Sequence, residues 1–159
     1  MADKAIGKSS ASIFLDKVKS SLGGNINLEP KDATEKWLYV SKSVSSSSSD
    51  LIDISYDYFG LAQAVALADV VRWICIKNTS TTNTDGIAIC LDGGAAAWNN
   101  NHSMVIGSGE MLILKCASAV TFADLHAIAI TMDGTYGYPT ATNSGTVSVE
   151  IAAIADDVS

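Results

Sequence analysis

Side chains able to do acid–base chemistry are sparse, and His126 is the better placed of the two histidines in the chain. A general base needs a nucleophile within hydrogen-bond reach and a carboxylate that orients its ring. Asp124 lies two residues before His126, and in a strand two such side chains share a face but stand about 7 Å apart. His102 follows a run of asparagines and is interpreted as a surface residue. The sequence therefore predicts no catalytic residues, and we expect that the protein is not an enzyme.

Potential metal ligands are present but widely spaced. The three cysteines contain no Cys-x-x-Cys pair and so lack the close spacing of structural zinc sites. Each lies in a strand-like run, where a free cysteine behaves as a small buried hydrophobe. Aspartate precedes glycine three times, which fits a calcium site or the turn chemistry of Asp-Gly, and we favour the turn. We expect neither a metal nor another cofactor. The residues concerned are Cys75, Cys90, Cys116, Asp85, Asp92 and Asp133.

Two further motifs suggest ligand binding. The glycine-rich stretches 91–97 and 106–111 lack the lysine and the following helix of a phosphate-binding loop, so we interpret them as turns. The loop aromatics Trp98, Tyr136 and Tyr138 offer apolar ring faces on which a sugar can stack. Loop aromatics also pack against neighbouring subunits, and the sequence leaves both alternatives open.

The charge of the chain is low and uneven. Charged residues make up 17% of the 159 residues, and the formal net charge is −7. After Lys42 the basic residues are Arg72, Lys77 and Lys115 alone, so a nucleic-acid groove, which needs clustered Lys and Arg, is not expected. Either a partner covers this weakly charged surface, or neutral Ser, Thr, Asn and Gly side chains form it. The first alternative predicts a homo-oligomer.

No segment predicts membrane insertion or export. The longest apolar stretch, 61–76, is interrupted by Gln63, Asp69 and Arg72 and is too broken for a membrane span. The chain opens without the charged and apolar regions of a signal peptide. We therefore expect synthesis in a reducing cytoplasm, with the cysteines reduced and buried, and no membrane partner.

The elements that must position these residues are strands closed by Gly-, Asn- or Thr-rich turns. This regular alternation is typical of an all-β sandwich or barrel, and a count of about eight strands favours an antiparallel sandwich of jelly-roll type over residues 31–159. Several strands are apolar on both faces, so something must cover their outer faces as well as the core side, and another subunit is one candidate. The clearest of the expected strands are 36–44, 50–56, 70–78, 87–92, 110–116, 126–133 and 147–154.

Residues 1–30 differ from the rest and are interpreted as an N-terminal arm and linker. A serine cap, apolar Phe14 and Val18 four residues apart, and Gly23-Gly24 as a stop predict a short amphipathic helix over 9–24. The competing prediction is an extended arm with a strand at 12–18. The basic charge of this segment and its apolar cluster suggest an element that becomes ordered by docking onto a partner. The cluster comprises Ile13, Phe14, Leu15 and Val18.

Three phrases of the chain resemble the virion structural proteins of tailed bacteriophages. They are "WICIKNTSTTNTDGIAICLDGG", "SMVIGSGEMLILKC" and "DLHAIAITMDG", at 73–94, 103–116 and 124–134. In this pattern a strand ends in Lys-Asn and a Thr/Ser/Gly turn, a Gly-Glu turn opens the next strand, and Leu-His starts a late one. The phrases are most similar to the jelly-roll capsid decoration, or cement, proteins.

The resemblance implies a non-enzymatic protein that binds the major capsid protein lattice as a dimer or trimer and stabilises the capsid. It would be assembled in the host cytoplasm and lie on the capsid exterior of the virion. The alternatives are a carbohydrate- or receptor-binding sandwich that uses Trp98, Tyr136 and Tyr138, and a tail or baseplate component. With the N-terminal cluster, these three aromatics are the residues expected to contact partners.

Overall fold

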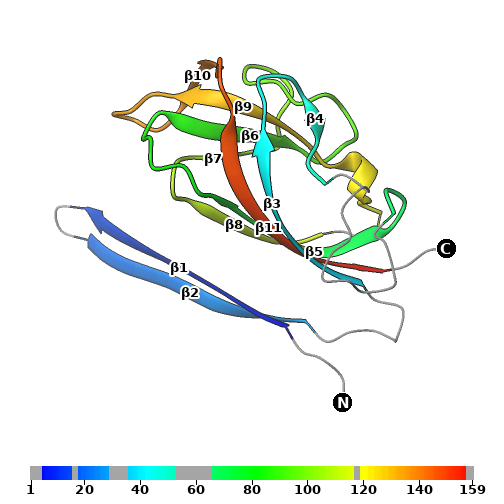
Figure 1. Ribbon diagram of the computed structural model, residues 1–159. Helices are drawn as coiled ribbons and strands as arrows, with labels where there is room; N and C mark the ends of the chain where they lie inside the picture. The colour runs from blue at the N-terminus through cyan, green and yellow to red at the C-terminus, as the bar shows by residue number, and fades with distance from the viewer. Residues whose placement is uncertain (1–4, 16–17, 29–35, 53–65, 117–118, 157–159) are drawn as a thin grey trace. The chain divides into compact units, whose positions relative to one another are not determined.

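The chain forms two compact units, residues 1–35 and 36–159. The computed structural model describes residues 5–15, 18–28, 36–52, 66–116 and 119–156, with the backbone alone for residues 5–15 and 18–28 and for Trp37. Both units consist of strands (Figure 1), and the one helix of the described ranges is the short 3₁₀ helix η1 (Phe122–Asp124). No helix in these ranges is long and apolar enough to cross a membrane.

The first unit is a β-hairpin. Strand β1 (Ala5–Leu15) pairs antiparallel with β2 (Val18–Leu28) along its whole length. The helix predicted over 9–24 is therefore wrong, and the extended prediction is closer. Serine and glycine, which are abundant here, favour the helix poorly, and Gly23 and Gly24 lie inside β2 opposite Ser10 and Ser9. At the end of the segment predicted as arm and linker, residues 25–28 belong to β2, and residues 29–30 lie outside the described residues.

The second unit is a sandwich of two antiparallel sheets (Figure 1). One sheet has the order β3 (Lys36–Val44), β11 (Val147–Asp156), β5 (Val70–Asn78) and β8 (Met111–Lys115). The other has the order β10 (Pro139–Thr142), β9 (His126–Met132), β6 (Asp85–Cys90) and β7 (Met104–Ile106). Strand β4 (Ser49–Asp50) also pairs with β9 in this second sheet.

The pairing of the strands is nested. The first strand of the sandwich pairs with the last, β3 with β11, and inside that pair β4 pairs with β9, β5 with β8, and β6 with β7. When these four strand pairs, taken as one long antiparallel ribbon, wrap around the core, β11 comes to pair with β5 and β6 with β9. The eight strands of these pairs form two Greek-key sheets, the arrangement of a jelly roll. The predicted fold class is thus confirmed, with β10 as an added strand.

The sequence located the long strands better than the short ones. Strands β3 and β5 have the predicted bounds. Of the run expected at 50–56, only Asp50 lies in a strand within the described residues, as the second residue of β4. Strands β7 and β10 were not predicted. Each is too short for its alternation to be recognised, and β10 begins at a proline, which is confined to edges and ends of strands.

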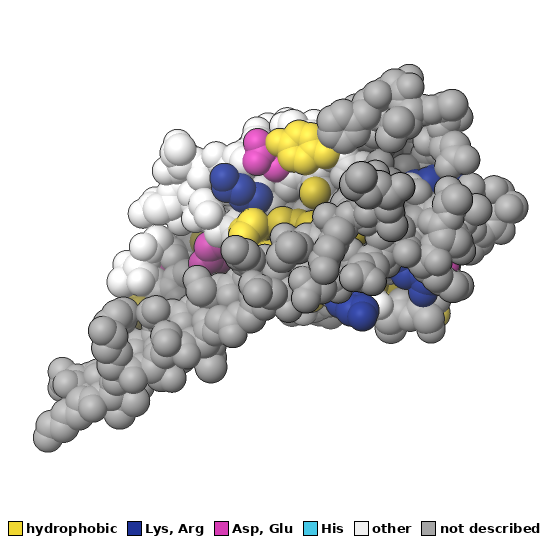
Figure 2. Space-filling model, turned by 90° about the horizontal axis from the view of Figure 1, so that it is seen from below, with side chains coloured by type: hydrophobic (Ala, Val, Ile, Leu, Met, Phe, Trp, Pro, Cys, Tyr) yellow, Lys and Arg dark blue, Asp and Glu magenta, His cyan; other side chains and the backbone are white. Residues whose placement is uncertain are grey.

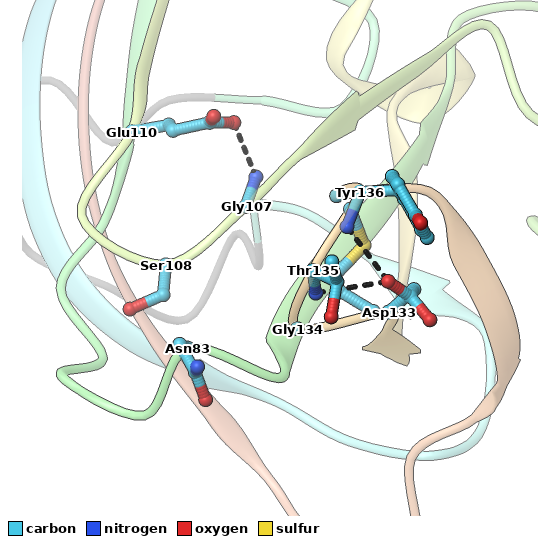
Figure 3. A pocket seen from close by; sticks show the side chains of 10 residues that line it. Asn83, Gly107, Ser108, Glu110, Asp133, Gly134, Thr135 and Tyr136 are labelled. Atoms are coloured by element: carbon cyan, nitrogen blue, oxygen red, sulfur yellow. Dashed lines mark hydrogen bonds between the residues drawn. The ribbon is translucent and has the colours of Figure 1, made fainter.

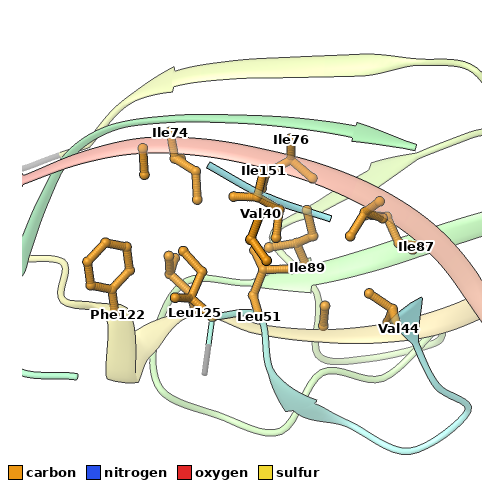
Figure 4. Close-up of a cluster of buried hydrophobic side chains, with 14 of the residues drawn as sticks. Val40, Val44, Leu51, Ile74, Ile76, Ile87, Ile89, Phe122, Leu125 and Ile151 are labelled. Carbon is orange, nitrogen blue, oxygen red and sulfur yellow. The ribbon is translucent and has the colours of Figure 1, made fainter. Parts of the chain in front are cut away.

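One face of each sheet supplies the core. In Figure 4 the side chains of Ile74, Ile76 and Ile151 point towards Leu51 and Leu125 of the opposite layer. Alternation along each strand places every second residue in this layer, and η1 adds Phe122, which is fully buried. At about 25 cal/mol per Å² of apolar surface, such burial is the main force that holds the two sheets together.

A second, smaller cluster covers the outer face of the five-stranded sheet. Ala88 and Cys90 of β6 and Ile128 and Ile130 of β9 are buried there, in the same cluster as Ala96 of the 91–101 loop. This loop and β7 also contribute the partly buried Trp98 and Val105 to the cluster. The chain itself therefore covers part of the apolar outer side of these strands, for which another subunit was one expected cover.

Three buried polar side chains, a Lys–Asp pair and an asparagine, fix opposite ends of β5. At its start, Lys36 Nζ of β3 lies 3.0 Å from Asp69 Oδ2, and both side chains are almost fully buried. At its end, the carboxamide of Asn78 donates from Nδ2 to Asp85 O at 3.1 Å and accepts from Ser80 N at 2.9 Å. The Asn78 backbone N–H donates to Glu110 O at 3.0 Å. Asn78 thus joins the four-stranded sheet to the first residue of β6 in the other sheet.

We predict that Asn78→Ala destabilises the sandwich by about 1–3 kcal/mol, because it removes a fully buried carboxamide and leaves the partly buried Asp85 carbonyl and Ser80 N–H without this partner. Urea unfolding followed by circular dichroism measures the change. Asn100→Ala, at an exposed asparagine, is the matched control and should change the free energy of unfolding by less than about 0.5 kcal/mol. Equal stability of the two variants would show that Asn78 does not couple the sheets.

Candidate functional site

His126 has a carboxylate partner, but not the one considered from the sequence. Its Nε2 lies 3.2 Å from Oδ1 of Asp50 on β4, whereas Asp124 caps η1, accepting from Thr121 N–H and Oγ1 at 2.8 Å each. The His126–Asp50 pair joins the short edge strand β4 to β9, and within the described residues Nδ1 of His126 has no hydrogen-bond partner. The geometry assigns this pair a role in holding the edge of the sheet.

The nearest potential nucleophile is Cys90, which is the cross-strand partner of His126. Its Sγ donates to Asp92 Oδ1 at 2.7 Å. Burial, and then the hydrogen bond to Asp92, raise the pKa of the Cys90 thiol; the same hydrogen bond and the Gly94 N–H lower the pKa of Asp92. The proton therefore stays on sulfur at neutral pH, which is the opposite of an activated thiolate.

Two of the three Asp-Gly pairs serve turns, as the sequence predicted: those of Asp133 and of Asp92, which accepts from Gly94 N–H. Asp85 and Gly86 instead begin β6, and the Asp85 carboxylate holds the turn before this strand. Asp133 Oδ1 accepts from the backbone N–H of Thr135 and of Tyr136, and Asp85 accepts from the Ser80 hydroxyl at 2.7 Å. Among the described residues no group of three or more His, Cys, Asp or Glu side chains is placed to hold a metal ion.

The outer face of the four-stranded sheet carries a row of apolar side chains that crosses every strand. Tyr39 of β3 and Cys75 of β5 are both cross-strand partners of Ala152 of β11, and Cys75 is paired with Ile113 of β8. Their chain neighbours point into the core, so alternation turns this row outward. With Met111, two residues before Ile113 on the same face, these residues form what we call the outer apolar face.

This face is accessible and has a charged border. Tyr39 is 46% and Met111 53% exposed, while Cys75, Ile113 and Ala152 are half-buried. In the next row across the sheet, Glu150 is paired with Lys77 and Lys77 with Met111. Figure 2 shows exposed hydrophobic side chains beside basic and acidic ones on the side of the molecule seen from below. Desolvation, and then the hydrogen bond to Glu150, raise the pKa of Tyr39.

The residues predicted to contact partners lie in three places. The N-terminal cluster lies at the closed end of the hairpin, where Leu15 is paired with Val18, and Ile13 and Phe14 precede Leu15 in β1. Trp98 is half-buried against the second cluster and does not form a platform with the tyrosines. Tyr136 and Tyr138 are exposed, with nearly parallel rings 6.3 Å apart between centroids.

Beside the tyrosines, three turns surround a pocket of about 390 Å³. The turn after β5 contributes Asn83, the turn before β8 contributes Ser108 and Glu110, and the turn between β9 and β10 contributes residues 133–137. Figure 3 shows Glu110, Asn83 and Asp133 around it. The sequence pointed to the tyrosines but not to Asn83, Glu110 or the outer apolar face, because only the fold brings these residues together.

No protein-family model matches the chain, and no curated protein matches it.

We predict that the three free thiols react slowly with an alkylating reagent at neutral pH, and that Cys90, which is buried, reacts slowest. Burial raises the pKa of Cys75, Cys90 and Cys116. Their thiolate fraction at neutral pH is therefore below that of a free cysteine. The labelling rate should keep rising with pH even above the pH at which a free cysteine is fully ionised. Mass spectrometry of the alkylated peptides measures each rate. The same protein in urea is the control, and rapid native labelling of all three would contradict the packing described.

Proposed function

We propose that the chain is a non-enzymatic structural protein of a tailed-phage virion, which decorates and stabilises the capsid by binding the lattice of the major capsid protein. The observation that carries the proposal is the outer apolar face, with Tyr39 and Met111 at its exposed ends. The sequence phrases that resemble capsid decoration proteins lie on the strands and turns of the same sandwich. As part of the proposal, the protein attaches to the capsid exterior as a dimer or trimer.

The composition of this face is that of a protein interface. Stable interfaces have an apolar centre, enriched in aromatic residues and methionine, inside a polar border. Here Tyr39, Cys75 and Ile113 cross the centre of the sheet, and the Glu150–Lys77 row borders them. A sheet gives a flat and rigid surface, because every central strand is hydrogen-bonded on both sides. Such a surface can dock on a lattice without the entropic cost of ordering loops.

The N-terminal hairpin supports the proposal as an attachment arm. It forms a compact unit of its own, and the positions of Ile13, Phe14, Leu15 and Val18 lie next to its turn in the pairing of the two strands. A two-stranded hairpin is marginally stable alone in water, so docking of this end onto a capsid subunit would stabilise it.

We predict that the purified chain co-sediments with empty capsids assembled from the major capsid protein of the same genome, and that Met111→Glu weakens this binding about ten- to a hundredfold. The reason is that a charge replaces an exposed side chain whose burial is worth about 1.5–3 kcal/mol. Ala141→Glu places the same charge on an exposed residue of β10 in the other sheet, and this variant should bind as the unmodified chain does.

Thermal melts show whether both variants fold. An unmodified chain that stays in the supernatant at all capsid concentrations would refute the decoration function. Equal binding by the two folded variants would instead place the attachment surface elsewhere on the protein.

We also predict that deleting residues 1–28 leaves the sandwich folded, with a melting temperature close to that of the full chain, and weakens capsid binding. Both strands of the hairpin are removed, and the sandwich keeps its own core. Differential scanning calorimetry and co-sedimentation measure the two effects. An unfolded truncated protein would show that the hairpin is needed for folding, and full capsid occupancy would show that it is not an attachment arm.

A further inference from the structure

The pocket beside Tyr136 and Tyr138 has the features of a ligand site that the decoration function does not use. Its walls are turns from three separate parts of the chain, and each turn is fixed by its own hydrogen bonds. The Ser108 hydroxyl donates to Ser80 O at 2.7 Å, which joins the turn before β8 to the turn after β5. Glu110 Oε2 accepts from Gly107 N–H at 2.6 Å and closes the first of these turns.

The hairpin turn that carries the tyrosines is rigid. The Asp133 backbone N–H donates to Tyr138 O and its carbonyl accepts from Gly137 N–H, both at 2.8 Å. The Asp133 carboxylate accepts two more N–H groups, those of Thr135 and Tyr136. Gly137, with φ of 69°, adopts the left-handed conformation that the turn requires. The rings are thus held on a preorganised backbone, which lowers the entropic cost of binding a ligand.

The two rings stack on each other and form an apolar platform, of which Tyr136 is the more exposed part. Tyr136 is 78% and Tyr138 53% exposed, and their planes are inclined by only 11°. Tyrosine supplies a large, rigid contact area at low cost in side-chain entropy. Two exposed rings with no core contact, on a turn with a fixed backbone, suit the apolar face of a sugar ring.

Polar groups with unused hydrogen-bonding capacity lie next to this platform. The Asn83 carboxamide makes no hydrogen bond to the described part of the chain, and Glu110 uses one carboxylate oxygen, leaving Oε1 available. A Cβ on Gly134 would lie 3.3 Å from Asn83 Nδ2, so the glycine gives the amide room. The charged side chains of the pocket, Glu110 and Asp133, are both acidic, which disfavours phosphates and acidic sugars.

We propose that this pocket binds a neutral glycan. One sugar ring stacks on the exposed ring of Tyr136, which Tyr138 supports by stacking on it, and its hydroxyls exchange hydrogen bonds with the Asn83 carboxamide and the free oxygen of Glu110. Few polar groups beside an apolar surface in a concave site are the usual composition of a small-ligand site. This function is separate from capsid attachment, which uses another face of the sandwich, so a decorating protein could also tether its particle to a surface glycan.

The test is a glycan array of neutral and acidic sugars probed with the full chain, followed by calorimetric titration of the best neutral ligand. We expect binding to neutral glycans, and a loss of about two- to tenfold in affinity for Tyr136→Ala, because the variant lacks the aromatic ring on which the sugar stacks. Asn83→Ala should also weaken binding. Tyr39→Ala, at an exposed tyrosine of the other sheet, is the matched control and should keep full affinity.

Three outcomes would overturn the proposal: no binding to any neutral glycan, binding to acidic glycans alone, or an affinity that Tyr136→Ala and Asn83→Ala leave unchanged. The outcome is independent of capsid binding, because Tyr136→Ala should co-sediment with capsids as the unmodified chain does. Circular dichroism of each variant confirms that it is folded before the titration is interpreted.

Discussion

The insertion of β11 between β3 and β5 is the constraint on which the sandwich depends. This last strand is hydrogen-bonded along nearly its whole length on both sides, and the rolled ribbon closes only when it occupies that place. Its inward residues Val147, Val149 and Ile151 are fully buried. Its outward Ala152 is small, so the larger Tyr39 and Cys75 on the flanking strands lie on either side of it. One strand thus creates both the core and the middle of the outer apolar face.

The sandwich that β11 completes places the two proposed functions in different parts of the protein. Capsid attachment is assigned to a sheet face, where side chains from four strands are held in register by the backbone ladder. The glycan pocket is assigned to the turns at the end of the sandwich where Asn78 terminates β5 and contacts the first residue of β6. The side chains at that end are held by turn hydrogen bonds, which tolerate changes of sequence more readily than strands do. A mutation at one site should therefore leave the other intact.

Much of the fold was predictable, because alternation over seven to ten residues defines β3, β5, β9 and β11 clearly. The N-terminal hairpin was not, since Phe14 and Val18 have helical spacing, and the pairing of β1 with β2 that overrides this spacing has no clear alternation of apolar residues to mark it. The exposed tyrosines could be predicted from their turn, whereas the half-buried position of Trp98 depends on packing against β6 and β9. The outer apolar face joins residues 39, 75, 113 and 152, a set that only the register of four strands reveals.

The central claim is that the outer apolar face contacts the capsid, and Cys75 at its middle is a natural probe of that contact. Its alkylation rate can be compared in the free protein and on capsids, with Cys116, packed against the interior core, as the internal reference. The account predicts that bound capsid slows the labelling of Cys75 strongly and leaves the rate at Cys116 unchanged. An unchanged rate at Cys75 in protein that is demonstrably capsid-bound would contradict it.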